Sequence, residues 1–130
     1  MKTPKGLKYT KTDEWVLVEG DDATIGITDF AQDQLSDVVY VELSVDEGDA
    51  VSKGDNAAMI ESVKAAADVS FPVSGTVSAL NEELADAPEV LNTDPFEAGW
   101  MIKLTLDDPS ELDGLMDSDE YQTYCEEREG

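Results

Sequence analysis

The chain is organised around the stretch Glu61-Ser62-Val63-Lys64-Ala65-Ala66-Ala67-Asp68, close to the middle of its 130 residues. Lys64 is the only basic residue between Lys53 and Lys103, in a sequence with 31 acidic side chains. Small residues follow Lys64, and hydrophobic runs approach it from both sides. We therefore expect Lys64 to lie at the tip of a β-hairpin that the rest of the chain presents to other molecules.

Two similar strand–turn units flank this lysine. A turn segment at 48–55 precedes a predicted strand at 57–61, and a predicted strand at 67–71 leads into the turn at 72–75 and a further strand at 76–80. Gly54 lies ten residues before Lys64, and Gly75 lies eleven after it. Short strands separated by regular turns indicate a small β-sandwich or flattened barrel, with the lysine at the apex of the central connection.

The remaining elements follow from apolar alternation, capping residues and turn residues. Strands are predicted at 15–18 and 23–27, with the turn 19–22 between them, and at 38–43 and 100–106. A short helix is predicted at 30–35, capped by Thr28 or Asp29. A second short helix should follow Asn81, which would cap it, and a third is predicted at 111–116, capped by Ser110. Residues 92–96 are expected to form a loop, and a last helix should start at 117–118 and carry Tyr121 and Tyr124.

The length predicts one domain. Residues 1–11 are expected to be a solvated, lysine-dotted segment, 12–106 the β core and 107–130 a helical tail. No apolar run is long enough to span a membrane, and no apolar segment follows the basic N-terminal residues, so the expected compartment is the cytoplasm.

The formal net charge of −23 disfavours binding to nucleic acid and to anionic membrane surfaces. Because the apolar residues are clustered and periodic, the chain reads as a folded domain with a very acidic surface. Self-repulsion strains such a surface in ordinary salt, whereas molar salt reduces the Debye length to ~3 Å. The composition therefore suggests an organism with a salt-rich cytoplasm.

The sequence has no histidine, and Cys125 is its only cysteine. This composition excludes an intramolecular disulfide, Ser-His-Asp and Cys-His catalysis, and zinc sites with histidine ligands. Cys125 lies in a polar tail among glutamates, which oppose thiolate formation. No close pair of carboxylates stands out from the acidic background, so an independent hydrolase is a weak reading. What remains for chemistry is an isolated lysine.

A lysine in a tight turn is ordinarily just solvated, and position alone leaves that reading open. The small neighbours Val63 and Ala65, and the apex position, favour a functional amine. The sequence resembles the H protein family of the glycine cleavage system over nearly its whole length. The matching segments are 13–16 (Asp-Glu-Trp-Val), 25–28 (Ile-Gly-Ile-Thr), 61–65 with Asp68, 72–75 (Pro-Val-Ser-Gly), 99–100 (Gly-Trp), and the tail residues 120–121 and 125–127.

The resemblance implies a barrel-sandwich hybrid, related to lipoyl and biotinyl carrier domains, with a C-terminal helical segment. It also implies that Lys64 carries lipoic acid through an amide on its side-chain nitrogen. Glu61, Ser62, Val63 and Ala65 would flank this site and be read by the lipoyl-attaching enzyme, although Glu61 serves equally well as the end of a strand. The protein would supply position and recognition, and the cofactor would supply the chemistry.

By the same resemblance, the chain is a shuttle and not an enzyme. Its lipoyl arm would receive an aminomethyl group at the pyridoxal-phosphate-dependent glycine decarboxylase and pass it to the tetrahydrofolate-dependent aminomethyltransferase. Dihydrolipoamide dehydrogenase, with FAD and NAD, would reoxidise the arm. The family folds the loaded arm, which bears the aminomethyl group, into a surface cleft. The matching cleft residues here are Thr12, Glu14 and Asp68, which also read as ordinary surface residues of an acidic protein.

Two alternatives and one departure accompany this reading. The first is another lipoyl or biotinyl carrier domain. Biotinyl domains place methionine on both sides of their lysine, where this chain has Val63 and Ala65, and lipoyl domains of 2-oxoacid dehydrogenases are shorter and lack the extra N-terminal hairpin and C-terminal helices. An unmodified adaptor with an acidic interaction surface is the other alternative, in which Lys64 is incidental. The departure is Asp13, where the family commonly has histidine, so the role of that position is open.

Overall fold

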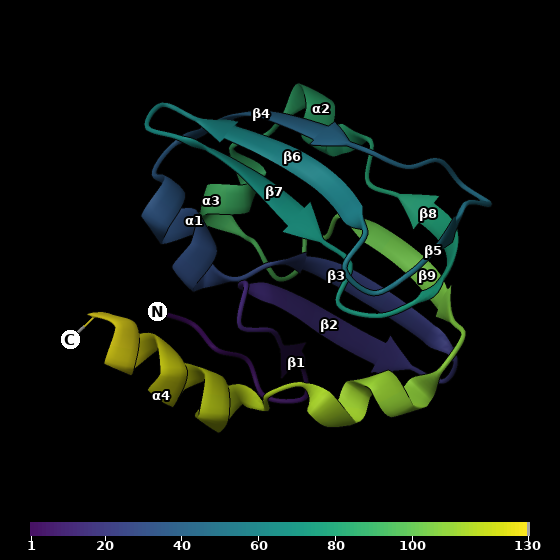
Figure 1. The fold of residues 1–130 in the computed structure, drawn as a ribbon. Helices are drawn as coiled ribbons and strands as arrows, with labels where there is room; N and C mark the ends of the chain where they lie inside the picture. The colour runs from purple at the N-terminus through teal and green to yellow at the C-terminus, as the bar shows by residue number, and fades with distance from the viewer. Residues whose placement is uncertain (130) are drawn as a thin grey trace.

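The computed structural model describes residues 1–129 and places their strands in two antiparallel sheets. The larger sheet runs β1 (Lys8–Tyr9), β2 (Glu14–Glu19), β3 (Asp22–Ile27), β9 (Ile102–Leu106), β8 (Gly75–Leu80) and β5 (Ala50–Val51). The smaller sheet runs β4 (Val38–Leu43), β6 (Asn56–Ser62) and β7 (Ala66–Ser70). Figure 1 shows the two sheets as layers, which confirms the predicted β architecture.

Apolar side chains on the facing sides of the two sheets form the main core. Along β4 and β6, Val41 pairs with Ile60, and both are buried because alternate residues of a strand point to the same face. Val16, Ile25 and Leu104 of the larger sheet are also buried in this core. Gly75 begins β8 and pairs with Leu106 of β9, and a Cβ there would approach the carbonyl oxygen of Thr105 to 2.1 Å, so the close approach of these strands requires glycine.

The helices lie around the edges of the two layers (Figure 1). They are α1 (Asp29–Leu35), α2 (Glu83–Asp86), α3 (Val90–Thr93), the 3₁₀ helix η1 (Pro109–Gly114) and α4 (Ser118–Glu129). Thr28 caps α1 by accepting a hydrogen bond from the Ala31 N–H, which decides between the two predicted caps. No helix within residues 1–129 has both the length and the apolar character needed to cross a membrane.

A second apolar cluster joins the N-terminal segment to α4. The Tyr9 and Tyr121 rings stack with centroids 4.7 Å apart, and Trp15 and Phe30 are buried beside them. The lysines of the first eleven residues are exposed, as expected, but the short strand β1 was not predicted, and Leu7 and Tyr9 within that segment are buried. Their burial depends on a helix more than a hundred residues later in the chain.

Several local predictions are wrong for identifiable reasons. Asn81 does not cap α2, because its side-chain amide donates to the carbonyls of Ala98 and Trp100 at 3.0 and 2.7 Å. Asp108, not Ser110, caps η1, since Pro109 already occupies the first helical position. The predicted strand at 100–106 begins at Ile102, and the predicted loop at 92–96 starts inside α3.

Candidate functional site

Lys64 lies at the tip of the β6–β7 hairpin, as the flanking turns predicted. The two strands pair from Asn56↔Ser70 to Glu61↔Ala66, which leaves the turn between Ser62 and Ala65. The Ser62 N–H donates to the Ala65 carbonyl at 2.8 Å, and the Ser62 hydroxyl accepts the N–H groups of Lys64 and Ala65 at 3.2 and 2.9 Å. Serine thus closes the turn and fixes the base of the Lys64 side chain.

The Lys64 amine is accessible. The side chain is exposed, and its Nζ approaches only the carbonyl oxygen of Gln34 at the end of α1, at 3.4 Å. Among the described residues the sole ion pair is Arg128–Asp13, so no carboxylate holds the lysine there. The hairpin is tied to the α1–β4 connection by the Val63 N–H, which donates to the Asp37 carbonyl at 3.0 Å.

Glu14 is the first residue of β2, and it is buried, with only 3% of its surface exposed. Its Oε1 accepts the hydroxyls of Thr10 and Thr12 at 2.7 and 2.6 Å. Its Oε2 has only a long contact, at 3.5 Å, with the Ser70 N–H. One oxygen is therefore occupied by two short hydrogen bonds, whereas the other has room for an incoming donor.

Burial raises the pKa of the Glu14 carboxyl above its ordinary value. Hydrogen bonds from Thr12, Thr10 and the Ser70 backbone lower that pKa, and the nearby charge of Asp13 raises it. The net result is a carboxylate that loses its charge at a higher pH than an exposed glutamate. A cationic partner would compensate the buried charge directly.

Two clefts share Thr12 and Glu14. The first, of about 340 Å³, lies toward η1 and is also lined by Lys11, Lys53 and Phe71. The second, of about 180 Å³, lies between α1 and β7. It brings together the three predicted cleft residues, of which Thr12 and Asp68 are exposed and Glu14 is buried, and it is also lined by Gln34. Gln34 thus both lines this second cleft and accepts the contact from the Lys64 amine, so the cleft lies on the side of the molecule from which Lys64 projects.

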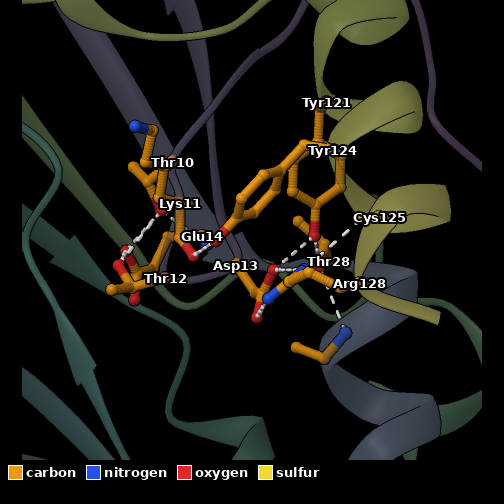
Figure 2. Close-up of polar contacts among 11 residues, drawn as sticks. Thr10, Lys11, Thr12, Asp13, Glu14, Thr28, Tyr121, Tyr124, Cys125 and Arg128 are labelled. Carbon is orange, nitrogen blue, oxygen red and sulfur yellow. Dashed lines mark hydrogen bonds and ion pairs between the residues drawn. The ribbon is translucent and has the colours of Figure 1, made fainter. Parts of the chain in front are cut away.

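The turn that carries Thr12 and Glu14 is held from α4 (Figure 2). The Tyr124 hydroxyl donates to the Lys11 carbonyl at 3.0 Å, and the Tyr121 hydroxyl donates to Asp13 Oδ1 at 2.8 Å. Arg128 donates to both oxygens of Asp13, at 2.5 and 3.2 Å. Asp13 has a φ of 72°, a left-handed conformation that aspartate tolerates better than most residues.

Arg128 is the residue of this network that sequence reasoning missed. It is the only arginine of the chain, a signal that could have drawn attention to it. Its guanidinium also stacks over the rings of Phe30 and Tyr124, at 4.1 and 4.3 Å from their centroids. The same network gives Asp13 a structural role. The interpretation of Cys125 as part of a polar tail is wrong, because this residue of α4 is fully buried in the same apolar cluster as Tyr9 and Tyr121.

The described part of the chain has no group of three or more histidine, cysteine or acidic residues arranged to hold a metal ion. The site consists instead of an exposed lysine on a rigid hairpin and a carboxylate in a cleft. Such an arrangement suits a covalently attached arm whose cationic end rests near Glu14.

Comparisons with known proteins agree on one family. The family model described as "Glycine cleavage H-protein" matches residues 7–128. A glycine cleavage system H protein from Alkaliphilus oremlandii is 54% identical over 97% of this chain and 98% of its own length. A probable one from Haloarcula marismortui is 51% identical, with 95% and 96% covered, and "Glycine cleavage system H protein 2, mitochondrial" from Arabidopsis thaliana is 52% identical, with 96% and 80% covered.

A solved structure supports the same likeness in three dimensions. The crystal structure of a glycine cleavage system H protein from Mycobacterium marinum superposes with a TM-score of 0.83 at 31% sequence identity. The superposition covers 92% of this chain and 96% of the other.

Proposed function

Because the chain belongs to the glycine cleavage H-protein family and is a lipoyl carrier of the glycine cleavage system, we propose that Lys64 is the residue to which lipoic acid is attached. The protein is a non-catalytic carrier, and it interacts with glycine decarboxylase, aminomethyltransferase and dihydrolipoamide dehydrogenase. Family membership thereby excludes the alternatives of another lipoyl or biotinyl carrier domain and of an unmodified adaptor.

One observation carries the assignment of Lys64: its exposed amine stands at the tip of a hairpin whose turn is closed by Ser62. The residues around it fit a lipoyl amide, since Ala65 and Ala66 are small and no acidic side chain holds the amine among the described residues. When bound, the lipoyl group supplies the dithiolane that takes up the aminomethyl group, and the lysine stem gives it reach. Flanking recognition by Glu61, Ser62, Val63 and Ala65 is part of the same proposal.

The test is the mass of the protein isolated from its source organism, followed by peptide mapping. A lipoyl adduct on the peptide that contains Lys64 is expected, with none on Lys53, which is an exposed turn lysine of the same chain and serves as an internal control. An adduct on a different lysine, or none on any, contradicts the assignment.

We also propose that the loaded arm rests in the cleft lined by Thr12, Glu14 and Asp68. The support is electrostatic, since the open oxygen of Glu14 suits a cationic end group. The exposed Asp68 carboxylate adds negative charge at the mouth, and Thr12 keeps the Glu14 side chain oriented. In this way the chain's own residues shield the arm from water between visits to its partner enzymes.

Arg128→Gln is expected to shorten the lifetime of the loaded arm severalfold. The substitution frees the Asp13 carboxylate, which raises the pKa of neighbouring Glu14 further and loosens the turn that holds it. The measurement is the hydrolysis rate of the loaded arm as a function of pH, in which the midpoint for loss of protection should move to higher pH.

A double-mutant cycle separates charge from structure in that experiment. Asp13→Asn removes the charge, keeps an acceptor for Tyr121 and tolerates the left-handed backbone. In the Asp13→Asn background, Arg128→Gln should no longer move the pH midpoint, because no carboxylate is left to neutralise. An equal shift in both backgrounds would show that Arg128 acts through packing alone.

The acidic surface suggests that the protein works in a salt-rich cytoplasm. The net charge is −23, yet only one ion pair forms among the residues that the structure describes. Repulsion between most carboxylates is therefore reduced only by dissolved salt. Names of plant relatives include "mitochondrial", whereas names of archaeal and bacterial relatives carry no organelle. Fractionation of the source cells tests the compartment.

Stability should rise with salt. We expect the midpoint of urea unfolding to increase from low to molar KCl, because the Debye length shortens to ~3 Å and repulsion between carboxylates falls. Sucrose at matched osmolality is the control, since it strengthens burial without screening charge. Equal midpoints at both KCl concentrations would contradict the salt-rich assignment.

We propose further that residues 1–130 act as a single carrier domain, with 12–106 as its β core. Both flanking segments support the core, since Leu7 and Tyr9 of residues 1–11 share a cluster with Tyr121 and Cys125 of residues 107–130. Limited proteolysis is the test, and one resistant fragment that retains both flanks is the expected result.

A further inference from the structure

An apolar patch lies beside Lys64. Among the described residues, only four large hydrophobic side chains are strongly exposed, and three of them belong to the hairpin end of the smaller sheet: Val39, Tyr40 and Val63, with exposed fractions of 54%, 43% and 68%. We refer to these three as the hairpin patch. Such a cluster around a functional residue marks an interaction surface, since solvent-exposed apolar groups are otherwise scattered.

A β-bulge creates this patch. Val38 pairs with Ser62 and Tyr40 pairs with Glu61, so the register shifts at Val39 and two successive side chains of β4 are exposed. Val63, directly before Lys64, is held against the start of β4 by the hydrogen bond from its N–H to the Asp37 carbonyl. The three apolar side chains are therefore fixed on the rigid base from which Lys64 projects.

The patch has an acidic rim. The Tyr40 hydroxyl donates to Glu42 at 3.0 Å, and Glu61 lies opposite Tyr40 on the next strand. The hydrogen bond to Glu42, followed by the charges of Glu42 and Glu61, raises the pKa of the Tyr40 phenol. Asp37 is also exposed beside the turn. The complementary surface on a partner is apolar at its centre and carries lysines or arginines at its edge.

We propose that the hairpin patch is the docking surface for the enzyme that acylates Lys64. This proposal rests on the assignment of Lys64 as the lipoyl site. In that reaction the deprotonated Nζ attacks the carbonyl of an activated lipoyl donor, an acyl anhydride or thioester. The amide C–N bond forms while the bond to the leaving group breaks, and the amine's proton passes to solvent or to a base of the enzyme.

Reach favours this partner over the others. The acylating enzyme has to bring its active site to Nζ itself, at the end of a four-carbon stem. It must therefore contact the protein surface next to the hairpin. The decarboxylase, the aminomethyltransferase and the dehydrogenase act on the dithiolane at the far end of the completed arm, so their chemistry does not require an active site at Nζ. A second copy of this chain is disfavoured as the occupant, because two acidic rims would face each other.

The test combines Val39→Thr and Tyr40→Thr, both of which keep good strand formers at exposed positions. We expect kcat/KM for lipoylation by the source organism's lipoyl-attaching enzyme to fall about tenfold, mainly through KM, as for interface residues that anchor binding. Tyr40→Phe should retain most of the activity, because it keeps the ring and loses only the hydroxyl. Val45→Thr, the same change at a half-buried valine beyond the other end of β4, is the control for position. Urea unfolding checks that each variant is folded.

Each other outcome has a defined meaning. Wild-type lipoylation of the double variant overturns the proposal. Normal lipoylation with impaired exchange at the decarboxylase assigns the patch to that enzyme instead, and a change from dimer to monomer assigns it to a second copy; both overturn the proposal. If the wild-type protein is itself never acylated on Lys64, the failure lies with the proposed function, and the docking proposal is overturned with it.

Discussion

Replacing Lys64 with arginine is expected to abolish lipoylation and all carrier activity while leaving the fold intact. Arginine keeps the positive charge and a long side chain, but its delocalised guanidinium stays protonated and cannot be acylated in place of the amine. The side chain is exposed and approaches only one backbone carbonyl, so its replacement removes no packing. The free energy of unfolding should change by less than about 0.5 kcal/mol, as for other surface substitutions.

Two measurements check this result. Intact mass reports whether the variant is acylated, and glycine cleavage reconstituted with the three partner enzymes reports activity. Lys53→Arg is the matched control, because Lys53 is an exposed lysine in the turn of the preceding strand–turn unit. The control should be lipoylated and active. Carrier activity in the Lys64 variant would require a different attachment point.

Glu14→Gln is expected to shorten the lifetime of the loaded arm about ten- to a hundredfold. Glutamine has nearly the same size and still accepts the hydroxyls of Thr10 and Thr12, so the turn keeps its shape. What it loses is the charge that holds a cationic end group. A charge-assisted hydrogen bond contributes about 1.5–3 kcal/mol, which corresponds to that range of rates.

The pH dependence gives an independent check on Glu14. Because burial raises the pKa of this carboxyl, the charge needed to hold the arm is present above that pKa and is lost as pH falls through it. Protection should therefore weaken at a higher pH than an exposed glutamate would give, and the glutamine variant should lack this titration.

Controls separate the cleft from the attachment site. Lipoylation of Lys64 should be unaffected by Glu14→Gln, since the hairpin turn is closed by Ser62 and not by the cleft. Glu19→Gln changes an exposed glutamate at the other end of β2 and should leave the lifetime unchanged. If hydrolysis of the loaded arm is as slow in the Glu14 variant as in the wild type, the arm rests elsewhere.

The hairpin was predictable because its signals are local. Turn residues and glycines at regular spacing marked the strands on both sides of Lys64, and the structure places the turn at the predicted apex. Strand β4 was found with its observed bounds, because a run of β-branched and aromatic residues favours one structure strongly. The family resemblance to the H protein, read from motifs that span the chain, is confirmed by the comparisons.

The predictions that failed depend on contacts between distant segments. Asn81 carries a good capping side chain, yet it donates to two carbonyls in the approach to β9. The pairing of Asp13 with Arg128 joins residues 115 positions apart, and the sequence around either residue does not predict it. The burial of Glu14 likewise depends on neighbours from other elements, so its raised pKa follows from the fold rather than from the motif.

The dependence of the turn around Asp13 on α4 has a consequence for the order of events during synthesis. The lysine hairpin and its ties to α1 and β4 involve residues 34–70, which leave the ribosome early. The turn at 10–14 acquires its anchors from Tyr121, Tyr124 and Arg128 only much later. A nascent chain therefore presents Lys64, the proposed attachment site, before the proposed cleft for the loaded arm is complete. Acylation would then be possible earlier than protection of the arm.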